Sequence, residues 1–397
     1  MGMKFCLVAC LLLAILLLCL AGCSTNSKSA TTGISYLYVT AQANSSISAY
    51  AVTQSTGALT SNGNAVATGT NPSAIAATPS GSALFVANSG SNSISSYSIN
   101  ADGTLSAVSG TTATGTTPVA LAVDPGGKYL FAADQTSSDI SVFAINGTGL
   151  TAAPGSPFTT IPAGLSYPNG TLPAAVAVSH SGNFLYIANQ LANFVSVFSI
   201  NSTSGALTPL GVPFYDDGQS SPSGLAVTPN GGFLYIANAG ANSNNISAYA
   251  ICDSVVTSCA NPNTPDGTLT PVSGSPFPAG LGPVAIAFDP GFNFAYVVDK
   301  GSNTVSQYSF GPGNGVLTPL SPGTISTGST PVSIAVLSGV VPADVGNTLF
   351  NITDYAYVAN LGSGTISIFS VTTASGLLNV VGQPVVIFGQ TSAVSPR

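Results

Sequence analysis

The sequence predicts an all-β protein, a seven-bladed β-propeller with four-stranded blades. A short aromatic and aliphatic segment recurs seven times at a spacing of 46 to 61 residues. Each copy is followed, after a short link, by a second strand-like segment, and six copies are preceded by a segment in which small and large residues alternate. Repeats of this length that hold several strands each are typical of propellers.

The recurring segment is expected to form the middle strand of each blade. Its copies are YLYVTA (36–41), ALFVAN (83–88), YLFAAD (129–134), FLYIAN (184–189), FLYIAN (233–238), FAYVVD (294–299) and YAYVAN (355–360). The short link after each copy predicts a hairpin to a third strand such as ISSYSI. Most copies continue with a Gly-x-Leu-Thr pattern or a close relative, which we expect to be an outer strand.

The segments before the middle strands are expected to be the innermost strands. They are PSAIAATP (72–79), PVALAVDP (118–125), PAAVAVSH (173–180), PSGLAVTP (222–229), PVAIAFDP (283–290) and PVSIAVLS (331–338). Their alternating small residues suit the crowded axis of a radial array. The first copy lacks such a segment, so we expect Pro384 to Phe388 to complete the first blade from the C-terminus and leave no open edge. The propeller would span residues 34–390, followed by a tail at 391–397.

The N-terminus predicts export. Lys4 precedes an apolar run from Phe5 to Leu20, which is typical of a signal peptide over residues 1–22. The sequence Leu-Ala-Gly-Cys at 20–23 resembles the lipobox of bacterial lipoproteins, which implies cleavage before Cys23 and its acylation. A transmembrane anchor is the alternative. Residues 23–33 would be a flexible tether, and the protein would be anchored through Cys23 in the outer membrane or at the cell surface.

Two cysteines remain beyond the predicted lipid anchor. Cys252 and Cys259 are seven positions apart, and in an exported chain a local disulfide is their simplest use. Metal ligation is the competing interpretation, but the intervening SVVTS adds no ligand. We therefore predict no metal site and no cofactor.

Composition excludes one class of partner. Charged residues make up 4% of the 397-residue chain, with five Lys and Arg against twelve Asp and no Glu, for a net charge of -7. Binding to nucleic acid requires clustered Lys or Arg to neutralise phosphates, and the chain has no such cluster. The expected partners are a membrane, through the lipid, and a glycan, polymer or protein ligand.

Polar residues end the middle strands at one face of the predicted ring. They are Asn88, Asp134, Asn189, Asn238, Asp299 and Asn360. One interpretation is that these residues start the hairpin by bonding its backbone. The other is that they form a polar ring that binds a ligand, with Tyr215, Asp216 and Asp217 of a nearby crossing segment as further candidates.

The remaining titratable residues fit turns of the repeat. His180, Asp124 and Asp289 lie at or just before the turn from inner to middle strand, so we expect structural roles for them. A Ser-His-Asp triad cannot be assembled around a single turn histidine.

The repeat resembles a known family. YVAN at 357–360, the P-x-A-ϕ-A-ϕ-x-P inner strand and the N-x-ϕ-S-x-ϕ-x-ϕ third strand are similar to YVTN-type seven-bladed propellers, a group that includes lactonase-like relatives of 6-phosphogluconolactonase. The resemblance implies the propeller fold and, for the lactonase branch, hydrolysis of a sugar lactone.

The functional expectation is a lipid-anchored propeller that acts as a binding or cell-envelope scaffold module without a catalytic site. The alternative is a lactonase-like hydrolase that uses Asp134 or Asp299 as a base, with Lys300 beside it. A phosphorylated lactone requires cations for its phosphate, and after removal of the signal only Lys28, Lys128, Lys300 and Arg397 remain.

Overall fold

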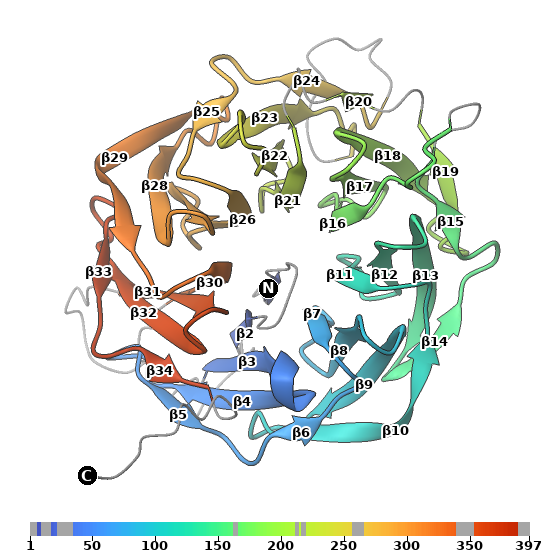
Figure 1. The fold of residues 1–397 in the computed structure, drawn as a ribbon, viewed down its shortest axis with the longest axis horizontal. Coiled ribbons are helices and arrows are strands. Elements are labelled where there is room, and N and C mark those ends of the chain that lie inside the picture. Colours follow the sequence, from blue (N-terminus) through green and yellow to red (C-terminus); the bar gives the residue numbers. More distant parts are fainter. Residues whose placement is uncertain are drawn as a thin grey trace.

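Seven antiparallel sheets surround a central axis in the computed structural model, as Figure 1 shows. The structure describes residues 6–8, 17–21, 35–161, 166–210, 214–215, 220–255, 266–338 and 353–387. In each sheet the main strands follow one another from the axis to the rim in chain order, and in five sheets one further short strand pairs beside the outermost strand. The predicted seven-bladed propeller is confirmed.

The middle and third strands of each blade form the hairpins that the sequence predicts. The pairs, which define blades 1 to 7, are β3 (Ser35–Ala41) with β4 (Ser46–Val52), β8 (Ala83–Asn88) with β9 (Ser93–Ile99), β12 (Tyr129–Asp134) with β13 (Asp139–Asn146), β17 (Phe184–Asn189) with β18 (Phe194–Ile200), β22 (Phe233–Asn238) with β23 (Asn245–Ile251), β27 (Phe294–Asp299) with β28 (Thr304–Phe310), and β31 (Asp354–Asn360) with β32 (Thr365–Val371). A short 3-10 helix, η1 (Gln42–Asn44), lies in the first hairpin.

The inner strands lie nearest the axis and are packed closely enough to require small residues. They are β7 (Pro72–Ala77), β11 (Pro118–Val123), β16 (Pro173–Val178), β21 (Pro222–Val227), β26 (Pro283–Phe288) and β30 (Pro331–Leu337). A Cβ atom added to Gly224 would lie 2.4 Å from the carbonyl oxygen of Val284 in the next blade. Ala74 and Ala76 are fully buried. The predicted columns of small residues therefore follow from the approach of neighbouring inner strands.

The outer positions are shared by two kinds of strand. The outermost strands are β5 (Leu59–Ser61), β10 (Leu105–Ala113), β14 (Gly149–Ala152), β19 (Leu207–Pro209), β24 (Leu269–Pro271), β29 (Leu317–Ser326) and β33 (Leu378–Val380). Short crossing strands pair with the other end of the third strand before the chain enters the next blade: β6 (Val66–Ala67), β15 (Phe158–Thr159), β20 (Phe214–Tyr215), β25 (Phe277–Pro278) and β34 (Val385–Val386). In blades 2 and 6 a single long strand, β10 or β29, takes the place of both the outermost strand and the crossing strand.

The predicted closure by Pro384 to Phe388 is wrong. Val385–Val386 pairs with β32 of blade 7, in the same way that Val66–Ala67 pairs with β4. It is therefore a crossing strand, and Val386 is 61% exposed rather than packed at the axis. The inner position of blade 1 is occupied by β2 (Leu17–Ala21), which pairs with β3, while β1 (Cys6–Val8) pairs with β2.

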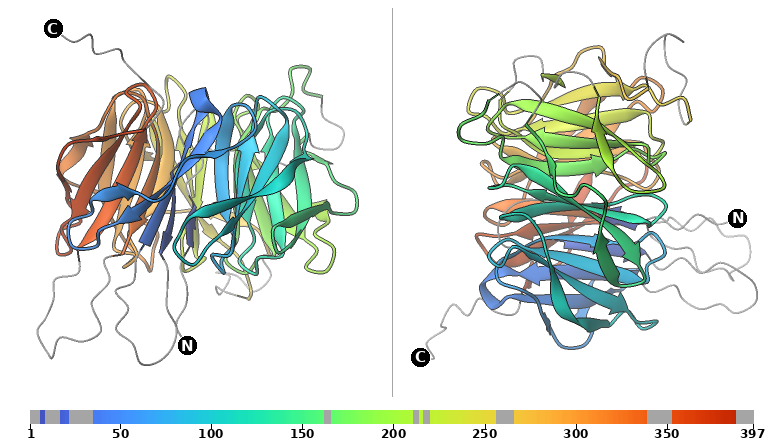
Figure 2. Two further views of the ribbon diagram at one scale, coloured as in Figure 1. Left: turned by 90° about the horizontal axis from the view of Figure 1, so that it is seen from below. Right: turned by 90° about the vertical axis from the view of Figure 1, so that its right-hand side faces the viewer.

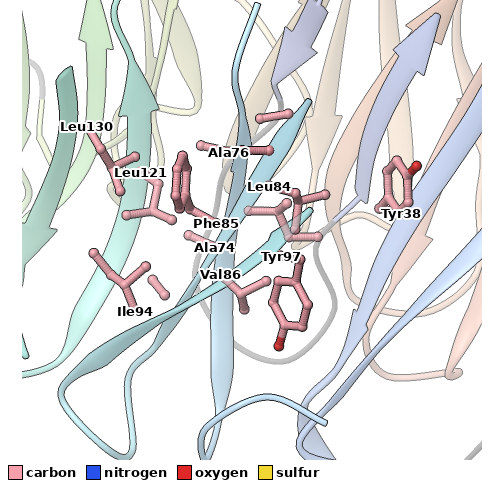
Figure 3. Close-up of a cluster of buried hydrophobic side chains, with 14 of the residues drawn as sticks. Tyr38, Ala74, Ala76, Leu84, Phe85, Val86, Ile94, Tyr97, Leu121 and Leu130 are labelled. Carbon is pink, nitrogen blue, oxygen red and sulfur yellow. The ribbon is translucent and has the colours of Figure 1, made fainter. Parts of the chain in front are cut away.

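The hydrophobic core lies between blades. Figure 3 shows Phe85 of β8 beside Leu121 and Leu130 of blade 3, and these three side chains belong to one buried cluster. Complete burial of each such side chain contributes roughly 1.5–3 kcal/mol. Because similar clusters continue around the ring, each blade is stabilised by its two neighbours.

A tyrosine contact closes the ring. The Tyr357 hydroxyl of blade 7 donates to the carbonyl oxygen of Gly57 in blade 1 at 2.9 Å, across 300 positions of sequence. Gly57 has a φ of +68°, and a Cβ atom there would lie 2.3 Å from the Tyr355 ring, so glycine is required. Equivalent bonds join other neighbouring blades: Tyr38 to Gly103, Tyr235 to Gly315 and Tyr296 to Gly376.

The strands run between two faces of the ring, as the side views in Figure 2 show. We name the face with the hairpins from middle to third strands the crossing face, because the chain also passes between blades there. The face with the turns from inner to middle strands is the turn face.

Candidate functional site

The polar residues that end the middle strands gather at the crossing face, as predicted, but they are inside the blades. All have an exposed fraction of 0%: Asn88, Asp134, Asn189, Asn238, Asp299 and Asn360. A ligand on the crossing face therefore meets no surface from them. The interpretation of these residues as a ligand-binding ring is corrected by their burial.

Their hydrogen bonds explain why they are there. Asn88 Nδ2 donates to Ser95 Oγ at 3.0 Å, and Asn88 Oδ1 accepts from the backbone N–H of Gly69 at 3.0 Å. The same residue thus ties the third strand and the chain that enters the blade to the middle strand. Bonds to the equivalent serine repeat around the ring: Asp134 with Ser141, Asn189 with Ser196, Asn238 with Ser247, Asp299 with Ser306, and Asn360 with Ser367.

The carboxylate of Asp299 accepts hydrogen bonds from three donors. Its Oδ2 accepts from Ser306 Oγ at 2.7 Å and from Thr304 Oγ1 at 3.2 Å, and its Oδ1 accepts from the N–H of Gly280 at 3.1 Å. Burial raises the pKa of Asp299 to about 6 in spite of these bonds. Because the carboxyl group has no exposed surface, Asp299 is not placed to act as a base on a substrate. Lys300, the next residue along the chain, is half-buried.

Blade 3 departs from the pattern, because a second carboxylate faces the first. Asp134 and Asp139 are opposite each other in the register of β12 and β13, where the sister blade 2 has Asn88 opposite Ser93. Asp134 Oδ2 accepts from Ser141 Oγ at 2.6 Å, and Asp134 Oδ1 is buried with no hydrogen-bond partner. Asp139 is half-buried, and its Oδ1 accepts from Ser137 Oγ at 2.9 Å.

The two carboxyl groups of blade 3 are close enough to affect each other's ionisation. Burial, together with the charge of Asp139, raises the pKa of Asp134. Burial also raises the pKa of Asp139. Neighbouring carboxylates resist joint ionisation, so one of the two keeps its proton at a pH where an isolated carboxyl group has lost it, which is a property of general acid–base groups. Asp139, which the sequence did not single out as a site residue, is the member of the pair with exposed surface.

On the turn face, the predicted structural roles of the aspartates agree with the geometry. Asp124 accepts hydrogen bonds from the backbone N–H groups of Gly126, Lys128 and Tyr129, at 3.0, 2.6 and 2.6 Å. Asp289 makes the equivalent set of bonds in blade 6. His180 is exposed in the same turn of blade 4.

Asparagines in the hairpins of the crossing face join one blade to the next. Asn193 Oδ1 accepts from the N–H of Ser221 at 2.7 Å, and Asn303 Oδ1 accepts from the N–H of Thr330 at 2.7 Å. Asn92 and Asn244 make the same contact with the blades that follow them. These residues are the Asn of the N-x-ϕ-S pattern, whose role between blades the sequence did not reveal.

Several predicted residues lie outside the described part of the chain. They are Cys23, Asp216, Asp217, Cys259 and the tail at 391–397, and of Tyr215 only the backbone is described. Cys252 is buried and disulfide-bonded, and its pairing with Cys259 stays a prediction.

Two searches for binding features were limited to the described residues. These residues include no group of three or more His, Cys, Asp or Glu side chains that could hold a metal ion. None of their helices has the length and apolar character to span a membrane.

The fold and the crossing-face hairpins define a seven-bladed β-propeller with an internal sevenfold repeat. The model of the lactonase family, described as a seven-bladed β-propeller, matches residues 30–154, 151–255 and 252–391. The chain belongs to this lactonase family. No curated protein sequence matches it.

Solved structures share the fold at low identity. A Bacteroides uniformis protein provisionally assigned as a 6-phosphogluconolactonase is 20% identical, with a TM-score of 0.67 over 94% of this chain and 96% of that one. The periplasmic gluconolactonase PpgL of Pseudomonas aeruginosa is 20% identical, with a TM-score of 0.56 over 80% and 84%. Hydrazine synthase of Kuenenia stuttgartiensis is 18% identical, with a TM-score of 0.58 over 86% and 93%. The fold alone thus accompanies different activities.

Proposed function

We propose that this protein is a lactonase that opens an unphosphorylated sugar lactone, with Asp139 as the general base and Asp134 as its buried partner. Membership of the lactonase family supports the reaction class. The observation that carries the assignment is the carboxyl pair of blade 3, which replaces the Asn and Ser of the sister blade 2. The residues at the position of Asp139 in the other blades are uncharged, so the second carboxylate is particular to blade 3: they are Ser46, Ser93, Phe194, Asn245, Thr304 and Thr365.

The chemistry is the addition of water to an ester carbonyl. Asp139 accepts a proton from the attacking water, whose oxygen bonds to the lactone carbonyl carbon. The bond from that carbon to the ring oxygen then breaks, and the proton passes to the ring oxygen to give the open hydroxy acid. Asp134 has no exposed surface and does not touch the substrate. It is a positioning residue whose raised pKa favours its protonated form, so that Asp139 beside it is the carboxylate that accepts the proton.

The substrate is expected to lack a phosphate. The described residues include only two cations: Lys128 lies in blade 3 but in the turn at the opposite end of β12 from the carboxyl pair, and Lys300 lies in blade 6. A phosphate would need charge-assisted donors beside the carboxyl pair. The activity of the P. aeruginosa relative makes gluconolactone the first substrate to test.

The test compares gluconolactone hydrolysis by the unaltered protein, by Asp139→Asn and by Asp299→Asn, each corrected for spontaneous hydrolysis. Asp299→Asn is the control because it removes a carboxylate from the crossing-face end of another blade, at the position that Asp134 has in blade 3. We expect Asp139→Asn to lose at least about tenfold in kcat/KM, and Asp299→Asn to retain full activity. Equal activity of the Asp139→Asn variant and the unaltered protein, or no turnover by the unaltered protein, would refute the proposal.

A binding or scaffold function is the second candidate. A surface hollow of about 420 Å³ lies between blades 1 and 2, lined by residues that include Asn62, Asn64, Val66 and Thr104. Its amide and hydroxyl groups suit a neutral polar ligand such as a glycan. A glycan thermal-shift screen tests this candidate, and Ala65→Trp, which fills the hollow, should abolish any stabilisation that is found.

We further propose that the protein is exported and anchored through acylated Cys23. The support is the sequence alone, namely the apolar leader and the Leu-Ala-Gly-Cys motif at 20–23. With Cys23→Ser, the protein should be found in the soluble fraction rather than in the membrane fraction. Retention of this variant in the membrane would contradict the anchor.

A further inference from the structure

The chain enters blade 4 through a longer segment than it uses for the other inner strands. Strand β15 ends at Thr159 and β16 begins at Pro173, whereas β10 ends at Ala113 and β11 begins at Pro118. Of this segment the structure describes residues 160–161 and 166–172. A segment that departs from its repeat in this way has a cause other than the fold, since the sister blades are connected without it.

Hydrogen bonds hold both ends of this segment against Ser138, the residue before Asp139. The Thr160 Oγ1 hydroxyl donates to the carbonyl oxygen of Ser138 at 2.8 Å. The N–H of Thr171 donates to Ser138 Oγ at 3.0 Å. The segment therefore lies directly beside the hairpin that carries the carboxyl pair.

Tyr167 lies on a buried aromatic ring within this segment. The N–H of Gly170 donates to the carbonyl oxygen of Tyr167 at 2.8 Å, so Tyr167 begins a turn that ends directly before Thr171. The rings of Tyr167 and Phe194 have 5.5 Å between their centroids and 53° between their planes. Phe194 is fully buried, whereas Tyr167 keeps exposed surface. The buried ring thus supports an aromatic side chain at the surface, one turn away from the hairpin of Asp139.

This aromatic pair is particular to blade 4. Phe194 lies opposite Asn189, which is the position that Asp139 has opposite Asp134 in blade 3. The five remaining blades have serine, threonine or asparagine there. The carboxylate and the aromatic ring therefore occupy equivalent positions in adjacent blades.

An exposed leucine adds apolar surface to the same region. The N–H of Leu191 donates to the carbonyl oxygen of Thr171 at 3.1 Å, and Leu191 is 47% exposed. Four sister blades have glycine at this place in the hairpin, and blade 3 has threonine: the residues are Gly90, Gly240, Gly301, Gly362 and Thr136. Two apolar side chains with exposed surface thus contact one short segment beside the carboxyl pair.

We propose that Tyr167 is a specificity-determining residue, a platform on which the sugar ring of the lactone stacks while its carbonyl group faces Asp139. The C–H groups of a pyranose ring belong to carbon atoms that carry oxygen, and such hydrogens are attracted to the negative face of an aromatic ring. Sites for neutral ligands combine apolar surface of this kind with a few polar groups. Tyr167 thereby selects sugar lactones over aliphatic lactones of the same ring size. The proposal rests on the lactonase assignment for the reaction, but the stacking of a sugar on Tyr167 does not depend on it.

Kinetics with two lactones test this selection. Tyr167→Leu keeps an apolar side chain over Phe194 but removes the aromatic face, whereas Tyr167→Phe keeps that face. We expect Tyr167→Leu to raise KM for gluconolactone about fivefold without a change in kcat, and to leave hydrolysis of δ-valerolactone unaltered. Tyr167→Phe should behave as the unaltered protein. Equal losses with both lactones, or equal losses in the two variants, would overturn the proposal.

A binding measurement separates the platform from the reaction. The probe is 1,5-anhydroglucitol, which has the sugar ring of gluconolactone but no carbonyl group, so it can bind and cannot be hydrolysed. Saturation-transfer NMR should show transfer to its ring protons from the unaltered protein, from Asp139→Asn and from Tyr167→Phe. Tyr167→Leu should lose most of this signal. The control is Tyr36→Leu, which changes another half-buried tyrosine at the turn-face end of blade 1 and should keep the signal.

The two measurements fail in different ways. If the unaltered protein binds the sugar through Tyr167 but does not hydrolyse gluconolactone, the platform stands and the lactonase assignment is refuted. No transfer from the unaltered protein overturns the platform. Equal transfer from Tyr167→Leu and the unaltered protein, or an equal loss with Tyr36→Leu, overturns it as well.

Discussion

Replacement of Asp299 by asparagine should stabilise the protein at alkaline pH, although it removes a carboxylate that accepts three hydrogen bonds. The folded protein raises the pKa of this carboxyl group from 3.8 to about 6, mainly by burial. The folded state therefore binds more protons than the unfolded state between these values, so the stability is greatest at low pH and falls as the pH rises through about 6. At about 1.4 kcal/mol for each pH unit, the penalty reaches roughly 3 kcal/mol at pH 8 and about 1 kcal/mol at pH 4.5.

Asparagine fits the site, because blade 2 already has it there. Asn88 Oδ1 accepts from Gly69 as Asp299 Oδ1 accepts from Gly280, and Asn88 Nδ2 donates to a serine that can rotate its hydroxyl. The Asp299→Asn substitution should thus raise the free energy of unfolding by up to ~3 kcal/mol at pH 8 and by less at pH 4.5.

Urea unfolding at the two pH values measures this gain. The reverse substitution, Asn88→Asp, should lose stability with the same dependence on pH. Asp102→Asn is the control at an exposed carboxylate, and because hydrogen bonds from Thr104 lower the pKa of Asp102, this variant should not gain stability at pH 8. An equal effect of Asp299→Asn at both pH values would refute the reasoning, because only ionisation distinguishes them.

Three further predictions address other parts of the ring. Tyr357→Phe should lower the free energy of unfolding by about 1 kcal/mol, because it removes the hydrogen bond to Gly57. Tyr186→Phe should leave the stability unchanged or raise it, because the buried Tyr186 hydroxyl has no hydrogen-bond partner. Calorimetry of both variants checks the difference. Asn303→Ala should lower the free energy of unfolding by about 1–2 kcal/mol and increase hydrogen exchange at the N–H of Thr330. Unchanged exchange at that N–H would contradict the role of Asn303 between blades. Hydrolysis of 6-phosphogluconolactone should not exceed the spontaneous rate, since Lys128 lies at the opposite end of β12 from the carboxyl pair and Lys300 lies in blade 6, and turnover of it would contradict the assigned substrate class.

The sequence predicts the propeller well because its period is visible in side chains that pack between blades. The closure was predicted wrongly for a physical reason. Pro384 and the valines after it have the Pro and apolar residues of an inner strand, but crossing strands are also short and apolar. The pairing of Val385–Val386 with β32 and the backbone bond from Ile387 to Gly364 show that the chain is still in blade 7 at that point.

The sequence allowed the location of the polar residues at the crossing face to be predicted, but not whether their side chains are exposed. The sequence places Asn88 and its equivalents at one face, but their burial depends on the chain that covers them. A Cβ atom on Gly69 would lie 2.7 Å from Asn88 Cγ, so this glycine brings the backbone directly over the side chain. The pairing of Asp134 with Asp139 was accessible from hairpin register, since the two residues flank one short link.

The hydrogen bonds that Asn92, Asn193, Asn244 and Asn303 make to the next blade are uncharged. Dissolved ions screen attraction between charges strongly, but they have little effect on a contact between an amide oxygen and a backbone N–H. The cohesion of the ring through these contacts should thus be insensitive to ionic strength. A propeller joined in this way can keep its blades together in dilute or saline surroundings alike.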